Sequence, residues 1–314
     1  MAQPAGRVRA TGTDPPAISV VVLAYQSRDR IDAPLRSLRA QDTEDAWEVI
    51  VVDSGNDGTA GYVAEHYPEV RVVRSDRRLR PGPGRNRGVR EARGHYVAFL
   101  PDDGVAEPEW LRRRLAAHRD GHAAVGGAVT NGTPYHPVGS AGYYAEYADL
   151  IPSERVLARQ AVPHNLSYER ALVERLGGFP EAPEPGEDTI LNRRILESGA
   201  SVTFDADIRL AHVNLRGLRE YLRHMRDHGR GLMRVVERGT MRSIVGPVRQ
   251  PAPVAAARML LLFPAWRWSR ALGLVALGRP RCVPGFLVLS PLVWAGLAAS
   301  GWGAWREWRA LTPR

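Results

Sequence analysis

Short apolar runs alternate with helix-like segments over residues 18–100. The runs are rich in Val and Ile and lack the polar alternation of a half-exposed strand, which is typical of strands buried on both faces. Alternating strands and helices predict βαβ units and a parallel, doubly wound α/β sheet. The expected strands are 18–23, 49–52, 70–73 and 96–100. Ligands bind such sheets beyond the carboxyl ends of the strands, so we expect a site near residues 24–26, Asp53 and residues 101–104.

The pattern after residue 104 is more mixed. Strands are predicted at 123–129, 162–168 and 202–211, and helices at 108–118, 169–176, 186–199 and 215–237, the last of them amphipathic and rich in arginine. Residues 1–17 are rich in Pro, Ala and Gly and contain no apolar run, so we expect a mobile leader without a signal peptide. The predicted domain organisation is this leader, a main domain over 18–240 and a helical region over 241–314.

The C-terminal region is strongly apolar. Residues 283–305 contain no charged side chain, and this run is longer than the roughly 20 apolar residues that cross a bilayer. Trp302 and Trp305 lie where an interfacial belt would be. Residues 253–277 are also apolar, but Arg258, Arg267 and Arg270 interrupt them, which favours an interfacial or re-entrant segment. We therefore predict membrane-associated helices, with buried helices packed on the domain as the alternative.

Charge and cysteine content narrow the class of partner. The formal net charge is +9, and all 43 basic residues are arginine. This balance suits acidic partners such as phosphates or anionic lipids. Nucleic-acid binding is the least favoured interpretation, because the arginines are spread along the chain without a recognised module. The single cysteine, Cys282, forms no intrachain disulfide, which fits a reducing compartment.

Two acidic pairs are candidates for chemistry. Asp102 and Asp103 follow the fourth predicted strand, where adjacent carboxylates would repel each other unless a cation offset their charge. Mg²⁺ typically takes one or two carboxylates together with substrate phosphates, although a solvated Asp-Asp-Gly turn has the same sequence. Glu187 and Asp188 begin a predicted helix, where acids also complement the helix dipole.

Basic residues and a histidine complete the candidate set. Arg85 and Asn86 lie near a helix start, where such residues suit phosphate or sugar contacts or else form a solvated face. His212 closes the strand region before a polar loop and is a structural histidine or a ligand.

Several motifs appear together in an order that resembles family 2 glycosyltransferases of the GT-A fold, over roughly residues 18–235. The matching segments are ISVVVLAY at 18–25, VVDSGNDGT at 51–59, RNRG at 85–88, YVAFLPDD at 96–103, HNLSYER at 164–170 with GGF at 177–179, and GED at 186–188. The resemblance implies a doubly wound mixed α/β sheet, a nucleotide-sugar donor and a divalent metal, Mg²⁺ or Mn²⁺.

The resemblance also implies roles for individual residues. Ala24, Tyr25 and Asp53 would hold the nucleotide base, Asp102 the ribose, and Arg85 and Asn86 further parts of the donor. Asp103 and His212 would bind the metal ion, and Asp188 with Glu187 would form the catalytic acidic pair, Asp188 acting as general base in an inverting transfer.

Two departures from the family pattern shape this expectation. Pro101 stands where the first residue of the usual acidic triplet would be, and the Gln-x-x-Arg-Trp motif of processive synthases is absent. The second departure favours transfer of one or a few sugars over polymerisation. The first keeps a catalytically inactive, membrane-tethered scaffold as an alternative.

A sugar-nucleotide pyrophosphorylase is the nearest enzymatic alternative. Such enzymes usually carry a Gly-rich signature after the first strand, which residues 24–28 lack. The expected acceptor is a lipid-linked or cell-envelope glycan, the expected location is the cell membrane, and the catalytic domain is expected in the cytoplasm, where nucleotide sugars are made.

Overall fold

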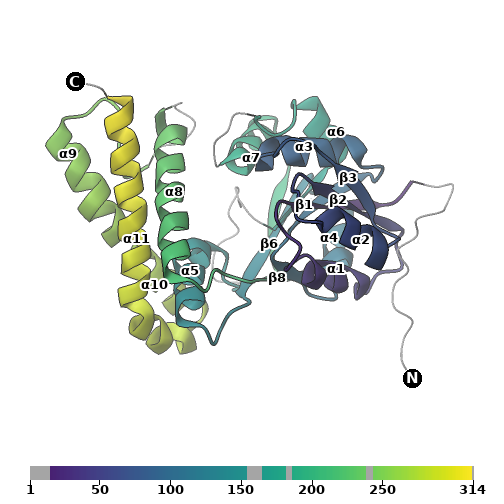
Figure 1. Ribbon diagram of the computed structural model, residues 1–314, viewed down its shortest axis with the longest axis horizontal. Helices are drawn as coiled ribbons and strands as arrows, with labels where there is room; N and C mark the ends of the chain where they lie inside the picture. Colours follow the sequence, from purple (N-terminus) through teal and green to yellow (C-terminus); the bar gives the residue numbers. More distant parts are fainter. Residues whose placement is uncertain (1–14, 154–164, 182–185, 238–242, 313–314) are drawn as a thin grey trace. The chain divides into compact units, whose positions relative to one another are not determined.

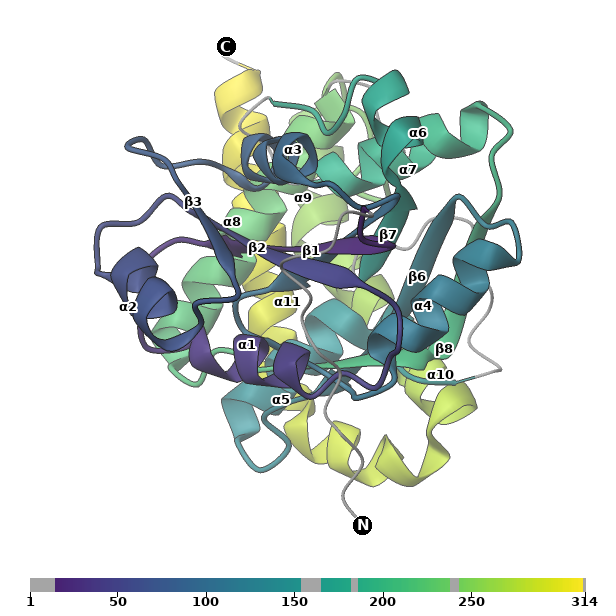
Figure 2. The ribbon, with the colours of Figure 1, turned by 90° about the vertical axis from the view of Figure 1, so that its right-hand side faces the viewer.

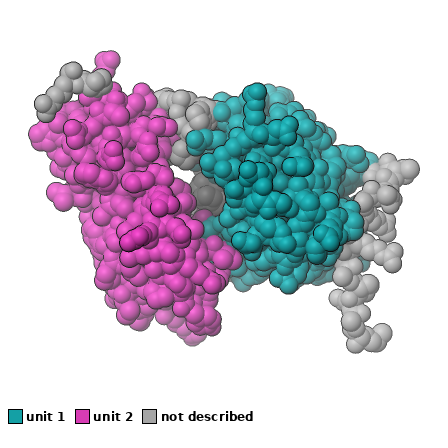
Figure 3. Space-filling view, viewed as in Figure 1, with its two compact units in different colours: residues 1–130, 158–183, 187–212 teal, residues 131–157, 184–186, 213–314 magenta. Residues whose placement is uncertain are grey.

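The computed structural model describes residues 15–153, 165–181, 186–237 and 243–312. The chain forms two compact units, shown in teal and magenta in Figure 3. Unit 1 comprises residues 1–130, 158–183 and 187–212, and unit 2 comprises residues 131–157, 184–186 and 213–314. Most of the predicted leader, and residues 162–164 of a predicted strand, lie outside the described residues. The predicted domain boundaries at residues 17 and 240 stay predictions.

The described part of unit 1 is built on an eight-stranded mixed sheet with the order β3-β2-β1-β4-β7-β6-β8-β5. The first four strands in this order are parallel, as the alternating pattern predicts, while β7 pairs antiparallel with both β4 and β6. The strands are β1 (Ile18–Ala24), β2 (Trp47–Asp53), β3 (Arg71–Arg74), β4 (Tyr96–Pro101), β5 (Gly104–Ala106), β6 (Ala124–Asn131), β7 (Leu166–Glu169) and β8 (Val202–His212).

Helices cover both faces of the sheet, so it is doubly wound (Figures 1 and 2). The helices α1 (Asp32–Arg39), α2 (Thr59–His66) and α4 (Trp110–Arg119) lie on one face, and α3 (Pro81–Glu91), α6 (Arg170–Arg175) and α7 (Glu187–Glu197) on the other. Ile31, Leu35 and Leu38, at helical spacing, are all buried beneath α1. The predicted α/β fold class is confirmed.

The Gly- and Pro-rich residues 80–84 predict a loop before a helix at 85–92, but this is wrong, because helix α3 already begins at Pro81. Pro81 occupies the first turn, where its missing N–H removes no intrahelical bond. The glycines are explained by packing, because a Cβ at Gly88 would overlap Val21 of β1 and one at Gly82 would overlap the Pro180 carbonyl. A sequence that reads locally as a turn is therefore a helix pressed closely onto the sheet.

Unit 2 is helical in its described residues. It contains α5 (Pro137–Tyr147), α8 (Leu218–Glu237), α9 (Ala252–Ala257), a π-helical turn (Arg258–Leu262), α10 (Phe263–Gly278) and α11 (Val283–Leu311). Two stretches, Ala252–Gly278 and Pro280–Leu311, are long and apolar enough to cross a membrane by length and composition. The sequence predicts α8 and the two apolar stretches but gives no sign of α5.

Helix α8 packs directly against α11 (Figure 1). A Cβ at Gly229 would overlap the Ser300 carbonyl, and one at Gly303 would overlap the Arg226 carbonyl, so the two backbones touch. Further along, Glu307 of α11 accepts hydrogen bonds from Arg230 (3.1 Å) and Arg234 (2.7 Å) of α8. The charged helix therefore covers one side of the apolar helix.

Candidate donor and catalytic site

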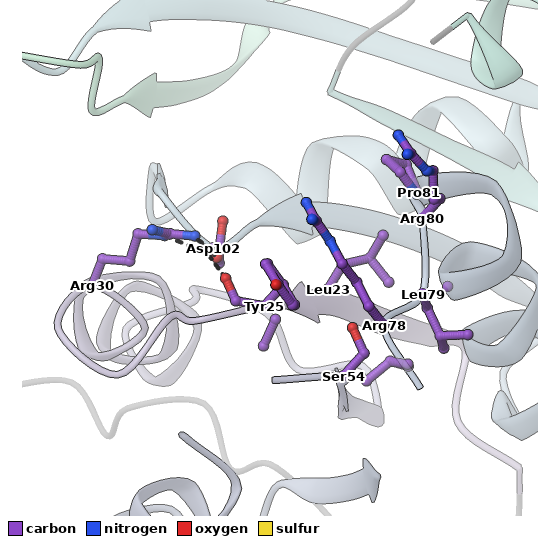
Figure 4. A pocket seen from close by; sticks show the side chains of 12 residues that line it. Leu23, Tyr25, Arg30, Ser54, Arg78, Leu79, Arg80, Pro81 and Asp102 are labelled. Carbon is purple, nitrogen blue, oxygen red and sulfur yellow. Dashed lines mark hydrogen bonds and ion pairs between the residues drawn. The ribbon is translucent and has the colours of Figure 1, made fainter. Parts of the chain in front are cut away.

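A cavity of about 230 Å³ lies in unit 1 at the carboxyl ends of β1 and β2 (Figure 4). Ala24 and Tyr25 line it at the end of β1, and Asp102 lines it just after β4. These three predicted donor-binding residues therefore meet at one cavity. The remaining lining residues are Leu23, Arg30, Val52, Ser54, Arg78, Leu79, Arg80, Pro81 and Gly84.

Asp102 is held by two residues that the sequence analysis missed. The Ser27 hydroxyl donates to Oδ2 of Asp102, and Arg30 approaches the same oxygen with Nε at 2.9 Å and Nη2 at 2.7 Å. Figure 4 shows the Arg30 side chain directed at Asp102. These contacts fix the carboxylate at the cavity wall through Oδ2, and Oδ1 can accept a hydrogen bond from a ligand hydroxyl.

Asp103 lies beside His212. Antiparallel pairing of β5 with β8 sets His212 opposite Gly104, which places the imidazole Nε2 3.3 Å from Oδ1 of Asp103. Burial raises the pKa of the Asp103 carboxyl above its ordinary value; His212 opposes this rise and the Asp102 charge adds to it. The two predicted metal ligands are thus brought together by strand register, with one oxygen and one nitrogen donor.

Glu187 and Asp188 form a second acidic group at the start of α7, and both are buried. Nη1 of Arg85, from α3, makes an ion pair with Glu187 and lies 3.8 Å from Oδ2 of Asp188. Burial raises the pKa of Asp188 above that of an ordinary aspartate, while Arg85 opposes the rise. The cluster is a buried carboxylate pair sharing one cation, and its raised pKa makes Asp188 a candidate proton acceptor.

Arg85 does not line the cavity, and its predicted donor contact stays a prediction. Its guanidinium lies 5.6 Å from the ring centroid of Phe99 and 5.3 Å from that of Phe179. The aromatic rings and Glu187 hold the guanidinium toward α7. In the structure Arg85 belongs with the acidic pair.

The side chains of Asp53 and Asn86 form hydrogen bonds with backbone groups. The Asp53 carboxylate accepts from the amides of Gly55 (2.9 Å) and Ala60 (3.1 Å), which fixes the loop between β2 and α2. The Asn86 amide donates to the Phe179 carbonyl (2.9 Å) and accepts from the Phe179 amide (2.8 Å). These bonds position the site's loops, and the predicted donor contacts of both residues stay predictions.

The cavity also carries positive charge that was not predicted from the sequence. Arg78 and Arg80 line it, and the Arg78 guanidinium lies 4.0 Å from the centroid of the Tyr25 ring. Their signal in the sequence is the basic run from Arg77 to Arg80, immediately before α3. With Arg30 on the other side, the cavity presents cations to an anionic ligand.

Residues 19–158 match the model of glycosyl transferase family 2. Over these residues the chain is similar to this family. The sequence-based prediction of a glycosyltransferase is thereby confirmed at the level of the family. The glycosyltransferase AglE of Haloferax volcanii is 28% identical over 200 residues, which cover 62% of this chain and 66% of that protein. The succinoglycan biosynthesis protein ExoO of Rhizobium meliloti is 28% identical over 284 residues, covering 74% of this chain and 80% of ExoO.

Solved structures share the fold. The mannosyltransferase PcManGT from Pyrobaculum calidifontis, in complex with GDP-Man and Mn²⁺, superposes with a TM-score of 0.59 at 21% identity, covering 95% of this chain and 89% of that one. A 1–349 fragment of S. aureus TarS in complex with UDP-GlcNAc gives a TM-score of 0.52 at 17% identity, covering 92% and 91%. The predicted GT-A architecture is confirmed.

Proposed function

We propose that this protein is an inverting glycosyltransferase that moves a sugar from a nucleotide-diphosphate sugar to an acceptor hydroxyl, using Mg²⁺ or Mn²⁺. The observation that carries the proposal is the cation-lined cavity that ends at Asp102, beside Asp103 and His212, in a family 2 unit. Nucleotide diphosphates need cationic partners, and this site offers arginine side chains as well as a set of metal ligands.

The cavity is suited to part of the donor. Its volume of about 230 Å³ is below the roughly 300–1,000 Å³ of pockets that enclose a drug-sized ligand. We assign it to the nucleoside, with Tyr25 and Ala24 at the base and Asp102 at the ribose. The arginines at its rim, Arg78 and Arg80, then suit the diphosphate.

Asp103 and His212 would hold a divalent ion. A carboxylate oxygen and an imidazole nitrogen are accepted by Mn²⁺, and a carboxylate with phosphate oxygens suits Mg²⁺. The Mn²⁺ in the PcManGT complex supports this assignment. The ion would neutralise charge on the leaving nucleoside diphosphate.

The acidic pair supplies the base. The acceptor oxygen attacks the anomeric carbon as the bond from that carbon to the diphosphate oxygen breaks, and Asp188 takes the hydroxyl proton. One displacement inverts the anomeric configuration. Arg85 opposes the rise in the pKa of Asp188 that burial causes, and Glu187 holds Arg85 in place.

For the acceptor we propose a lipid-linked or cell-envelope glycan, reached at the cytoplasmic face of the cell membrane. The name of ExoO, a succinoglycan biosynthesis protein, and that of the putative teichuronic acid glycosyltransferase TuaG of Bacillus subtilis support a glycan product. Exposed apolar side chains on the C-terminal helices support membrane association, among them Leu261 (67% exposed) and Val288 (79% exposed).

Contacts within unit 2 favour helices that lie in the membrane interface over a helix that crosses it. Two of the three arginines that interrupt the first apolar stretch contact α5 and the turn after it: Arg267 donates to the Ala145 carbonyl (2.6 Å), and Arg270 pairs with Asp149 (2.5 Å). Crossing by α11 would also carry the arginines of α8 into hydrocarbon, which is strongly unfavourable. Interfacial binding leaves those arginines in water or at lipid headgroups.

The proposal is tested by titrating UDP- and GDP-sugars into the full chain in mild detergent, with Mn²⁺, Mg²⁺ or EDTA. We expect one nucleotide class to bind and to bind more tightly with the metal. Asp103→Asn should remove the metal dependence, while Asp120→Asn, an exposed aspartate at the end of α4, should not. Binding that no metal strengthens would contradict the metal assignment. Binding without any donor hydrolysis or transfer would favour the inactive scaffold.

A further inference from the structure

A cluster of metal-ligating side chains lies in unit 2, away from the residues assigned above. His224 and His228 are four residues apart on α8 and therefore share one face of the helix. Glu146, near the end of α5, contacts both: its Oε2 lies 3.0 Å from Nε2 of His224 and 3.9 Å from Nδ1 of His228. All three residues belong to unit 2, so their grouping is a property of that unit alone.

The three side chains have the spacing of a ligand set. One donor atom from each lies within 4.8 Å of the others. Around a tetrahedral Zn²⁺, with bonds of about 2.0–2.1 Å to nitrogen and oxygen, donor atoms stand a little over 3 Å apart. Small rotations of the exposed histidines would close that difference, because their side chains are 40% and 47% exposed while Glu146 is held at 15%.

We propose that Glu146, His224 and His228 form a binding site for a zinc-class divalent cation. Two imidazoles and one carboxylate favour Zn²⁺ over Mg²⁺, which prefers oxygen donors. Three protein ligands leave a fourth position for water or an added ligand, and the partial exposure of the histidines gives an ion access. This site differs in chemistry from Asp103 with His212, and it does not depend on the proposed function.

The ion would join α5 to α8. The segment around Glu146 also receives Arg267 and Arg270 of α10, at the Ala145 carbonyl and at Asp149. A metal bond at Glu146 would therefore tie α8 and, through α5, α10 into one helical assembly. The expected consequence is a cation-dependent gain in the stability of unit 2, since an ion that binds only folded protein stabilises it.

The test is calorimetric titration of ZnSO₄ into metal-stripped full-length protein in the Asp103→Ala background, which removes the carboxylate ligand of the proposed donor metal. We expect one Zn²⁺ per chain, no displacement by millimolar MgCl₂ and a raised melting temperature. Losing a ligand should weaken binding by more than the roughly 10–100-fold caused by mutating an outer partner. His224→Ala with His228→Ala should therefore abolish tight binding and the thermal shift.

The matched control is His66→Ala, an exposed histidine of α2 in unit 1 (47% exposed side chain). It should leave Zn²⁺ affinity unchanged. His228→Ala alone keeps the test decisive if the double variant misfolds, because His228 is exposed at the helix surface. Zn²⁺ affinity that is equal in the wild type and the histidine variants, or a site that Mg²⁺ fills equally well, would overturn the proposal.

Discussion

Replacing Arg85 by Gln should move the pH dependence of catalysis. Arg85 is the cation in contact with the buried Glu187 and lies 3.8 Å from Asp188. Gln keeps much of the side chain's volume over Phe99 and Phe179 but removes the charge. Without it, burial acts on Asp188 with less opposition, so its pKa rises further above the ordinary value.

The separation sets the size of the effect. Two unit charges about 4 Å apart interact by roughly 4 kcal/mol at an effective dielectric constant near 20. One pKa unit corresponds to about 1.36 kcal/mol, so losing this interaction can raise the pKa of Asp188 by at most about three units. Partial exposure of Arg85, 19% of its side chain, lowers this value. We expect the acid limb of the kcat/KM profile to move up by about 1–3 pH units.

A stability measurement checks the same charge. Removing one partner of a buried ion pair costs about 3–5 kcal/mol, because a charge is left uncompensated. A carboxyl whose folded pKa is raised favours folding when protonated, and this contribution is lost as pH rises through the folded pKa. The Tm deficit of Arg85→Gln should therefore be largest near neutral pH and shrink as the acids become protonated.

The assay is the pH profile of sugar transfer, with Arg87→Gln as the control. Arg87 lies on the same helix and pairs with Glu91 at 3.1 Å, but it is 47% exposed, so its loss should change neither profile nor Tm appreciably. A folded Arg85→Gln enzyme whose acid limb coincides with that of the wild type would refute the reasoning, because Arg85 would then not influence the group that limits the reaction at low pH.

Two further outcomes are expected. Asp188→Asn should keep donor binding and lower kcat by roughly 10²-fold or more, whereas Glu187→Gln should cost less, because Glu187 acts through Arg85; the reverse order would exchange their roles. In sealed vesicles, an impermeant maleimide should label Cys282, and a Cys introduced by Thr312→Cys in a Cys282→Ser chain, from the same side; labelling from opposite sides would show that α11 crosses the membrane.

The sequence predicts the parallel half of the sheet well because its signal is local. Each of the strands β1, β2 and β4 is a nearly continuous buried run. A strand that is buried on both faces needs consecutive apolar residues, and these are visible in the sequence. Helix α1 is likewise set by its own apolar spacing. Helix α5 escapes prediction because small residues and tyrosines give it no clear stripe; it is held by packing against α11.

The site is predicted less completely because its contacts are distant in sequence. The predicted site residues Ala24, Tyr25, Asp102 and Asp103 lie at or just after strand ends, where a parallel sheet gathers its ligand edge. The contacts of Asp102 with Ser27 and Arg30 join residues more than seventy positions apart, and no spacing rule reveals them. The grouping of Glu146 with His224 and His228 is of the same kind.

Different residues of helix α3 contact different parts of the candidate site. Its first turn, with Pro81 and Gly84, lines the donor cavity, while Arg85 reaches the acidic pair of α7. The helix can serve both because its glycines allow it to lie against β1, where a Cβ at Gly84 would already stand 3.2 Å from Leu23. The motif around Arg85 and Asn86 therefore lies on a helix that lines the cavity with its first turn and contacts the acidic pair through Arg85. A substitution that moved α3 away from β1 would be expected to disturb donor binding and proton transfer together, whereas Arg85→Gln should alter proton transfer alone.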